Sequence, residues 1–266
     1  MKGLVEGKVA VITGAGSGVG QAAALLFTRH GARVVVADID AARADETVAL
    51  VQAEGGEACA AHCNVADEAD VERLIALAVA TYGRLDILYN NAGITVTGSP
   101  GKGPKSLVET TAAEITAIQA VNVDGVLYGC KAAIAVFAQQ GGGGAIVNTA
   151  SIAGLIGYGG VAYGATKGAV VGLTRTLAIE VAAQGIRVNS VCPAGMPTRY
   201  GGMDATGPQA DRVRQSMGSA HPLGRAIDPM DCASAALFLV SDLASNITGV
   251  NLPVDGGLSA GVPLRR

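Results

Sequence analysis

The sequence has few aromatic residues, no tryptophan and no excess of basic residues. Phenylalanine, tyrosine and tryptophan together make up 3% of the 266 residues, and the formal net charge is -3. A protein that binds nucleic acid usually carries a basic patch, so this charge balance argues against a nucleic-acid partner. No uninterrupted apolar run approaches the ~18 residues that a membrane-spanning helix needs, and we expect no membrane association.

The chain also lacks the marks of a secreted or metal-binding protein. Residues 1–7 contain no apolar stretch of the kind found in signal peptides. The five cysteines are odd in number and scattered, which fits reduced thiols better than a disulfide framework. Cys59, His62 and Cys63 form one possible metal cluster, but no second pair completes a zinc site. We therefore expect a soluble cytoplasmic protein without a metal.

Glycine, alanine and valine are abundant instead. Half of the residues are hydrophobic and 38 are glycine, a composition typical of helices packed closely on β-branched strands. The length suits one α/β domain better than two, and no repeat or linker divides the chain. We therefore expect residues 1–266 to form a single domain.

Short β-type segments alternate with helical segments along the chain. The first strands, 8–13 and 33–37, flank a glycine-rich turn and a helix over 21–30, which makes a βαβ unit. Further strands are expected at 58–63, 85–89, 145–149, 186–191 and 250–254. The alternation predicts a doubly wound, Rossmann-like α/β fold with a mostly parallel seven-stranded sheet and helices on both faces.

Two stretches interrupt this alternation. Residues 95–106 are rich in glycine and proline, and residues 194–222 mix turn residues with a short charged segment. Both follow a predicted strand, and open parallel sheets bind their ligands beyond the carboxyl ends of the strands. Each stretch is therefore a candidate cover for a substrate, the alternative being a solvated surface loop.

The turn from Thr13 to Gly20 (TGAGSGVG) joins the first strand to the first helix. Glycines there let the backbone turn tightly and let a pyrophosphate approach the amides at the helix N-terminus. Val19 takes the place of the last glycine in the strict G-x-G-x-x-G pattern, so the turn follows the looser T-G-x-x-x-G-x-G form. It predicts a dinucleotide-binding turn, and close packing alone is the alternative.

Asp38 ends the second strand, 20 residues after Gly18. A carboxylate there would accept hydrogen bonds from an adenosine ribose and repel a 2′-phosphate. Neither Ser17 nor Ile39 supplies a basic group to attract such a phosphate. The cofactor expected is therefore NAD. A helix N-cap is the alternative role for Asp38, and the two roles are compatible.

Tyr163 and Lys167 are four residues apart at the start of a predicted helix, so both side chains lie on one face. A nearby ammonium favours the phenolate and brings the tyrosine pKa towards the working range of an acid-base catalyst. Tyr158 is a rival for this role, but residue 162 is alanine where its lysine would stand. A surface contact between Tyr163 and Lys167 is the simpler reading of this pair taken alone.

Polar segments follow two further strands, and they complete a resemblance. Asn90-Asn91-Ala92-Gly93 and Asn148-Thr149-Ala150-Ser151 both lie where the cofactor crevice is expected. Together with the glycine-rich turn and the Tyr163–Lys167 pair, in this order, they make residues 7–257 resemble a classical short-chain dehydrogenase/reductase. Val254-Asp255-Gly256-Gly257 resembles the last strand of that family and its exit.

The resemblance implies a role for each matching residue. Tyr163 matches the acid-base tyrosine, Lys167 the lysine that lowers its pKa and binds the nicotinamide ribose, and Ser151 the hydroxyl that polarises the substrate carbonyl. Asn122 matches the asparagine that holds a water in the proton relay. Gly14, Gly18 and Gly20 match the pyrophosphate turn, and Asn90 and Gly93 match the motif beside the adenosine ribose. The complete set of expected cofactor contacts is Gly14, Ser17, Gly18, Val19, Asp38, Asn64, Val65, Asn91, Ala92, Gly93, Tyr163, Lys167, Pro193, Met196 and Thr198.

The sequence departs from the family pattern at four places, one of which is the loop at 95–106, which is longer than usual. Asn64 stands where the family commonly has an aspartate near the adenine, and its amide oxygen still accepts a hydrogen bond. The interval from Ser151 to Tyr163 is one residue shorter than usual. After the sixth strand, Pro193-Ala194-Gly195-Met196-Pro197-Thr198 replaces P-G-x-V-x-T, which affects the backbone on the nicotinamide side. None of these departures removes a catalytic group.

The prediction is an NAD-dependent oxidoreductase that interconverts a secondary alcohol and a ketone, with Tyr163 as acid-base. The alternatives are a dinucleotide-binding scaffold protein without catalysis and a family member that acts on another bond type, by reducing a carbon-carbon double bond or by epimerisation. Apolar walls at 152–158 and 196–217 favour a hydrophobic hydroxy or keto substrate. Helices at 126–138 and 165–183 are apolar on more than one face, which indicates a homo-oligomer, and the resemblance implies a homotetramer.

Overall fold

The computed structural model describes residues 3–97, 103–196, 198 and 208–261. Within these ranges, the strands are β1 (Val9–Thr13), β2 (Arg33–Asp38), β3 (Glu57–His62), β4 (Ile87–Asn90), β5 (Gly144–Thr149), β6 (Ile186–Pro193) and β7 (Asn251–Val254). The helices are α1 (Gly18–Arg29), α2 (Ala41–Ala53), α3 (Glu68–Tyr82), α4 (Ala112–Gln119), α5 (Gly125–Gln140), α6 (Val161–Val181), α7 (Pro208–Ala220) and α8 (Pro229–Val240). A π-helical turn, η1 (Ala120–Asp124), joins α4 to α5, and short 3-10 turns are η2 (Ile152–Gly154), η3 (Ala182–Gln184) and η5 (Asp242–Ala244).

The seven strands form one sheet in the order β3-β2-β1-β4-β5-β6-β7. Every neighbouring pair runs parallel, from Arg33 opposite Glu57 at one side to Pro193 opposite Val254 at the other. The predicted fold class is confirmed. The strand order reverses between β1 and β4, and such a switch point leaves a crevice at the carboxyl ends of the strands.

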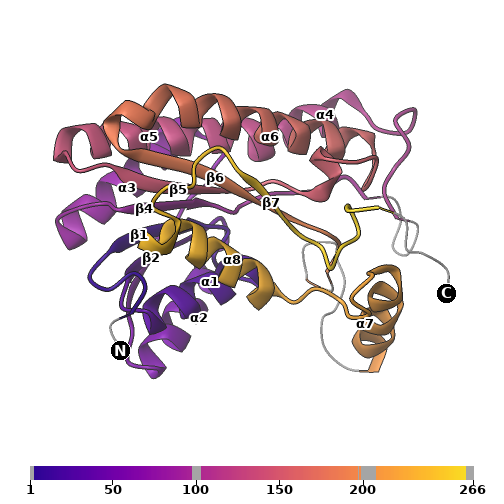
Figure 1. Cartoon of the computed structure of the whole chain (residues 1–266), viewed down its shortest axis with the longest axis horizontal. Helices are drawn as coiled ribbons and strands as arrows, with labels where there is room; N and C mark the ends of the chain where they lie inside the picture. Colours follow the sequence, from indigo (N-terminus) through magenta and orange to yellow (C-terminus); the bar gives the residue numbers. More distant parts are fainter. Residues whose placement is uncertain (1–2, 98–102, 197, 199–207, 262–266) are drawn as a thin grey trace.

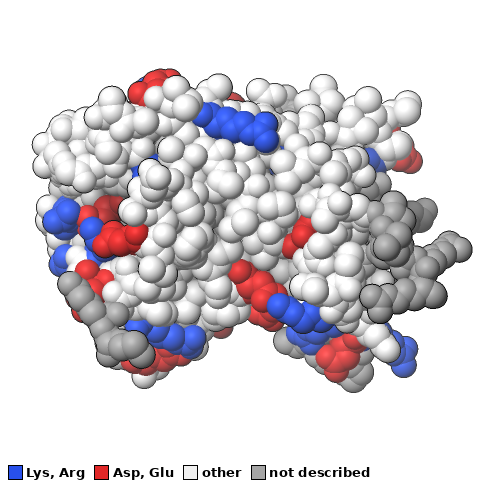
Figure 2. Space-filling model, viewed as in Figure 1, with Lys and Arg blue, Asp and Glu red and all other residues white. Residues whose placement is uncertain are grey.

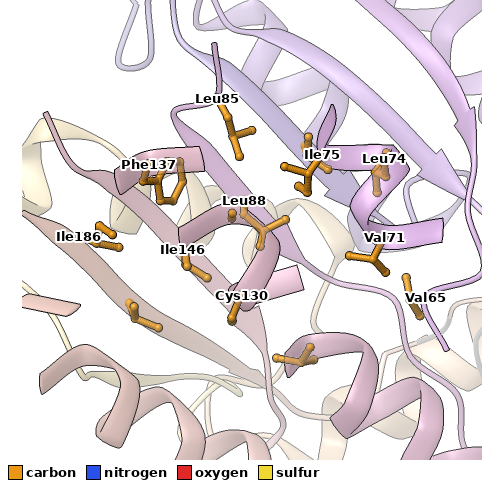
Figure 3. Packing of buried hydrophobic residues seen from close by; sticks show 14 of the residues in the cluster. Val65, Val71, Leu74, Ile75, Leu85, Leu88, Cys130, Phe137, Ile146 and Ile186 are labelled. Atoms are coloured by element: carbon orange, nitrogen blue, oxygen red, sulfur yellow. The ribbon is translucent and has the colours of Figure 1, made fainter. Parts of the chain in front are cut away.

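Helices cover both faces of the sheet, as Figure 1 shows, with α4, α5 and α6 on one side and α1, α2 and α8 on the other. The two apolar layers are separate clusters of buried residues. One joins the sheet to α3, α5 and α6, and Figure 3 shows Phe137, Leu88 and Leu74 spread along it. The other joins the sheet to α1, α2 and α8 and includes Phe27 and Tyr89. Strands buried on both faces account for the nearly continuous apolar runs in their sequences.

Local sequence signals set several helix ends. Asp67 accepts from the backbone N–H groups of Ala69 and Asp70 at the start of α3, and Gly83 ends this helix in the left-handed conformation. Asp228 and Asp231 form a reciprocal capping box at the start of α8, where proline occupies the first turn. These caps fix where each helix leaves and rejoins the sheet.

The continuous helical segment Ala112–Gln140 is long and apolar enough, by length and composition alone, to cross a membrane. It is composed of α4, η1 and α5, and charged residues interrupt the apolar sequence that forms it. In the fold, Val126, Cys130 and Phe137 of α5 lie buried in the cluster against the sheet. Its apolar composition is therefore explained by core packing. On the face seen in Figure 2, acidic and basic residues are interspersed and no basic stripe is present.

Residues 208–220 differ from the prediction. The sequence favoured a loop with a charged segment over 194–222, whereas the chain forms helix α7 at Pro208–Ala220. In Figure 1 this helix lies beyond the end of α8 and apart from the helices that cover the sheet. The other interrupting stretch, 95–106, lies partly outside the described residues, and its described ends meet in an antiparallel bridge between Thr97 and Pro104.

Candidate active site

The polar residues singled out in the sequence gather at the carboxyl ends of β1, β4, β5 and β6. Thr13, at the end of β1, links the first two of these strands. Its hydroxyl accepts hydrogen bonds from the backbone N–H groups of Asn91 at 3.0 Å and Ala92 at 3.1 Å. The Asn91 amide donates back to the carbonyl oxygens of Thr13 and Gly14, at 3.0 and 3.1 Å. The segment after β4 is thereby fixed directly beside the glycine-rich turn.

Tyr163 and Lys167 lie in the first turns of α6, as predicted. The Lys167 ammonium is 5.7 Å from the centroid of the Tyr163 ring. It also donates a 2.7 Å hydrogen bond to the carbonyl oxygen of Thr149, at the end of β5. This bond positions the lysine between the tyrosine and the strand that leads to Ser151. Thr149 is a contact that sequence reasoning missed, because a backbone carbonyl carries no residue-specific signal.

Lys167 is almost completely buried, with 2% of its surface exposed. Burial lowers the pKa of its ammonium to about 8, while the nearby Cys192 opposes this shift. Among the described residues, no acidic side chain forms a salt bridge with Lys167. Its positive charge therefore acts on the Tyr163 phenol without a competing carboxylate.

Ser151 follows β5 and begins the short turn η2. Its hydroxyl donates to the carbonyl oxygen of Pro193 at 3.2 Å and accepts from the backbone N–H of Ala153 at 3.1 Å. The side chain is buried, at the point where the ends of β5 and β6 meet. A hydroxyl held in this way keeps a second lone pair and can turn its proton towards a substrate oxygen.

Asn122 lies at the centre of η1, completely buried. Its amide oxygen accepts from the backbone N–H of Ile94 at 2.8 Å, and its amide nitrogen donates to the Ile94 carbonyl at 2.9 Å. The same nitrogen donates to the Thr166 hydroxyl at 3.1 Å, on the turn of α6 between Tyr163 and Lys167. Asn122 thus connects the segment that follows β4 to helix α6. Single π-turns inside helices occur frequently at functional sites.

The glycine-rich turn has the backbone geometry of an anion cradle. Gly14 and Gly18 have positive φ angles of 61° and 54°. A Cβ on Gly14 would lie 2.8 Å from the Cα of Ala92, and one on Gly20 would lie 2.3 Å from the Gly14 carbonyl oxygen. Ser17 is the N-cap of α1, and its side chain makes no capping bond. The amides of the first helical turn therefore remain available to a pyrophosphate, so this turn fits the expected group.

A cavity of about 430 Å³ begins at this turn and extends along the outer face of α1 towards α2 and α8. Gly16, Ser17 and Gly18 line it, together with Thr198 and with Arg214 of α7. Ser151 and Tyr163 do not line it. The cavity therefore lies along the glycine-rich turn and does not extend to Ser151 or Tyr163.

Asp38, at the end of β2, lies beside the turn as predicted. One carboxylate oxygen accepts from the backbone N–H of Gly16 at 2.9 Å, and the other accepts from Asp40 at 3.0 Å. Asp40, not Asp38, is the N-cap of α2. Each oxygen of Asp38 retains a lone pair for a ribose hydroxyl. Arg43 is a nearby cation, and its guanidinium pairs with Asp40 at 3.1 Å.

Two adjacent asparagines after β4 have different surroundings. Asn90 is buried in the core, where its amide donates to Asn148 at 3.0 Å and to the Cys130 sulfur at 3.4 Å. Its side chain is held within the sheet and against α5, so its contacts are those of a structural residue. Asn91 contacts the glycine-rich turn, and Gly93 follows it on the same segment.

Asn64 and Val65 follow β3, near the expected adenine end of the crevice. The Asn64 amide oxygen accepts from the backbone N–H of Ala66 at 3.2 Å, and its backbone N–H donates to Asp70 at 3.1 Å. Val65 is buried against Gly125 of α5, where a Cβ on the glycine would lie 3.1 Å from the valine side chain. The amide oxygen of Asn64 therefore already accepts one hydrogen bond within its own turn.

The segment after β6 reaches both halves of the site. Pro193 accepts from Ser151, and Met196 accepts from the backbone N–H of Thr198 at 2.9 Å. The Thr198 methyl lies 3.8 Å from the position that a Cβ on Gly18 would take. Val19, one residue further, packs with Met196 beside a small apolar cluster. These contacts connect the segment after β6 to the glycine-rich turn.

The structure shows all five cysteines as free thiols. No group of three or more His, Cys, Asp or Glu side chains in the described part of the chain could hold a metal ion.

Comparison with known proteins gives consistent matches over the chain. Residues 14–259 match the family model described as enoyl-(acyl carrier protein) reductase. The chain is 40% identical over 256 residues to meso-2,3-butanediol dehydrogenase of Serratia marcescens, covering 96% of each protein. It is 39% identical over 263 residues to 2,5-dichloro-2,5-cyclohexadiene-1,4-diol dehydrogenase of Sphingobium indicum, covering 98% of this chain and 100% of the relative. A crystal structure of a short-chain type dehydrogenase/reductase from Mycobacterium marinum superposes with a TM-score of 0.86 at 31% identity, covering 97% of each chain.

Proposed function

This chain belongs to the classical short-chain dehydrogenase/reductase family, and from that membership we propose that it is an NAD-dependent oxidoreductase of secondary alcohols and ketones. In the oxidative direction, an alcohol and NAD⁺ give a ketone, NADH and a proton. The observation that carries the proposal is the placement of the buried Lys167 ammonium 5.7 Å from the Tyr163 ring.

Tyr163 is proposed to remove the hydroxyl proton of the alcohol, and to return a proton to the carbonyl oxygen in the reverse direction. The Lys167 charge, in a buried setting, favours the phenolate over the phenol. Since burial lowers the lysine pKa to about 8, most of the lysine is protonated at neutral pH and supplies this charge. The phenol can then exchange a proton near neutrality, as an acid-base catalyst requires.

Ser151 is proposed to hold the substrate oxygen during the reaction. Its hydroxyl is buried and already oriented by Ala153, so little reorganisation is needed when it exchanges the Pro193 carbonyl for a substrate oxygen. Asn122 is proposed to position this machinery through Ile94 and Thr166, and to support the proton relay at the π-turn. The nicotinamide ring, when bound, would accept the hydride from the carbinol carbon.

The dinucleotide is proposed to lie across the switch point of the sheet. The amides at Gly18 would bind the pyrophosphate, and Asp38 would accept from the adenosine ribose. Two hydrogen bonds from the backbone hold the Asp38 carboxylate in place, and its charge would repel a 2′-phosphate. Arg43 is the nearby cation that could attract a 2′-phosphate, and it forms a salt bridge with Asp40. These features support NAD over NADP. Contacts from Asn91, Ala92, Gly93, Pro193, Met196 and Thr198 are proposed for the remainder of the cofactor.

The matching family model raises a second candidate, because its description names reduction of an enoyl group. A serine hydroxyl buried beside the Tyr163–Lys167 pair suits a carbonyl or carbinol oxygen, and this favours alcohol and ketone chemistry. A scaffold protein without catalysis would have no use for a buried lysine that forms no ion pair with an acid. The experiment below separates the three.

We also infer one dinucleotide-binding and catalytic domain over 1–266, a homotetramer and a cytoplasmic location. The helices α5 and α6 expose apolar side chains, among them Leu127, Val161 and Ile179, which a second copy of the chain would cover. The free thiols suit a reducing compartment.

The test is a fluorescence titration of the purified chain with NADH and with NADPH, followed by turnover of secondary alcohols, ketones and an enoyl thioester. We expect tighter binding of NADH and turnover of alcohols. Tighter binding of NADPH would overturn the role of Asp38. Turnover of the enoyl compound alone would favour the second candidate, and cofactor binding with no turnover of any compound would favour a scaffold.

A further inference from the structure

Tyr158 lies beside the catalytic residues, and the proposed reaction gives it no role. Tyr158 is 41% exposed and lies on the segment between η2 and α6. The phenol oxygen lies 2.9 Å from the position that a Cβ on Gly195 would occupy, so the side chain crosses from the end of β5 to the segment after β6. Its hydroxyl makes no hydrogen bond with another described residue.

The position of this hydroxyl follows from its neighbours. Ser151 contacts the Pro193 carbonyl at 3.2 Å, and Gly195 is two residues further along, a distance of at most about 7 Å in extended chain. Gly159, next to Tyr158, would place a Cβ 3.2 Å from the Tyr163 ring. The Tyr158 hydroxyl therefore lies at the same edge of the site as Ser151 and Tyr163, but one or two residues further along the segment after β6.

The two segments that the Tyr158 side chain connects carry mainly apolar residues. Ile152 and Ala153 are buried on the segment that leads to Tyr158, and Ile156 and Met196 lie on the same two segments. A substrate with one oxygen would use Ser151 and Tyr163 and would leave the Tyr158 hydroxyl unmatched. A substrate with a second oxygen would give it a partner, since a phenol both donates and accepts.

We propose that Tyr158 is a specificity residue that binds a second oxygen of the substrate, so that the enzyme prefers diols and hydroxy ketones to simple alcohols. This inference rests on the proposed alcohol dehydrogenase function. Two relatives of this chain carry the names of diol dehydrogenases, which agrees with the substrate class. Gly195 fits the same account, because any larger residue there would displace the Tyr158 hydroxyl.

The experiment compares kcat/KM for matched pairs of compounds: meso-2,3-butanediol with 2-butanol, and 1,4-cyclohexanediol with cyclohexanol. We expect the wild-type chain to prefer the diol in at least one pair. Tyr158→Phe removes only the hydroxyl, and we expect it to reduce that preference about 10- to 100-fold, mainly through KM, with kcat/KM for the mono-alcohol unchanged within about twofold. NADH binding should also be unchanged.

Gly195→Ala provides an independent variant, because its methyl group would lie 2.9 Å from the phenol oxygen and displace the end of the ring. The φ angle of Gly195 is not positive, so alanine suits the backbone. We expect a reduced diol preference here as well. Gly157→Ala is the matched control on the neighbouring segment, where a Cβ would meet nothing within 4 Å, and its preference should equal that of the wild type.

The outcomes separate this inference from the proposed function. A wild-type enzyme that oxidises secondary alcohols but prefers no diol, or a Tyr158→Phe variant that keeps the preference, refutes the role of Tyr158 and leaves the function standing. An equal loss for diol and mono-alcohol also refutes it, since the hydroxyl would then serve catalysis in general. A wild-type chain that oxidises no secondary alcohol refutes both.

Discussion

The buried ammonium of Lys167 should make the stability of the protein depend on pH in a direction that a surface lysine would not give. Burial lowers its pKa from 10.5 to about 8 in the folded chain, whereas the unfolded chain keeps the ordinary value. Between these two values the unfolded state binds the additional proton. The free energy of unfolding therefore rises as the pH increases from about 8 through 10.5, and this contribution is absent below about pH 8.

The size of the effect follows from the shift. A difference of about 2.5 pKa units corresponds to about 3.4 kcal/mol when the titration is complete, at 1.36 kcal/mol per unit. At pH 9 only part of it is gained, about 1.4 kcal/mol relative to pH 7. A Lys167→Met variant should lack this term. Since Tyr163 lies beside the lysine and its phenol is also ionisable, both proteins should carry Tyr163→Phe.

The assay is urea denaturation at pH 7 and pH 9, at one protein concentration because subunit association shifts apparent stability. We expect the unfolding free energy of Tyr163→Phe, minus that of Tyr163→Phe with Lys167→Met, to increase by about 1.4 kcal/mol between the two pH values. A change below about 0.5 kcal/mol, or of opposite sign, would mean that Lys167 titrates near its ordinary pKa. The reasoning about its burial and its effect on Tyr163 would then be wrong.

Three further substitutions test the rest of the site. Gly14→Ala should weaken NADH binding at least tenfold and should lower the unfolding free energy by more than Gly55→Ala does. Both residues have positive φ, but only a Cβ at position 14 would meet backbone, at 2.8 Å from the Cα of Ala92. Equal effects of the two substitutions on NADH binding and on stability would contradict this. Asn122→Ala should lower the unfolding free energy by about 3 kcal/mol, since it leaves buried partners unpaired; a loss below about 1 kcal/mol in urea denaturation would refute its positioning role. Asp38→Asn removes a charge with little change in shape, so the ratio of the NADPH and NADH dissociation constants should fall about tenfold in a fluorescence titration, and an unchanged ratio would count against the NAD assignment.

The sheet could be predicted well because its strands are buried on both faces. Runs such as Val34 to Val36 leave no alternative to an interior strand, and the observed bounds differ from the predicted ones by at most two residues at the ends of most strands. Helix α7 was missed for the opposite reason. Its sequence is mostly polar, with Asp211, Arg212 and Arg214 close together, so its narrow apolar face did not mark it as a helix packed on the core.

The residues proposed for catalysis were singled out from the sequence, but their connections could not be. The bonds from Lys167 to Thr149 and from Asn122 to Ile94 involve backbone atoms, which look alike in every sequence. The π-turn at Asn122 depends on one extra residue in a helical turn and has no composition of its own. Asn90 and Asn91 are adjacent in the sequence, and the geometry of the strand end determines which one faces the core.

The most direct test of the account is the Tyr163→Phe variant, measured for NADH binding and for turnover of a secondary alcohol on the same preparation. If Tyr163 is the acid-base group, kcat should fall by about 10³-fold or more, while the dissociation constant for NADH stays within about threefold of the wild type. A variant that binds NADH normally and keeps more than about a tenth of the turnover would contradict the proposed mechanism.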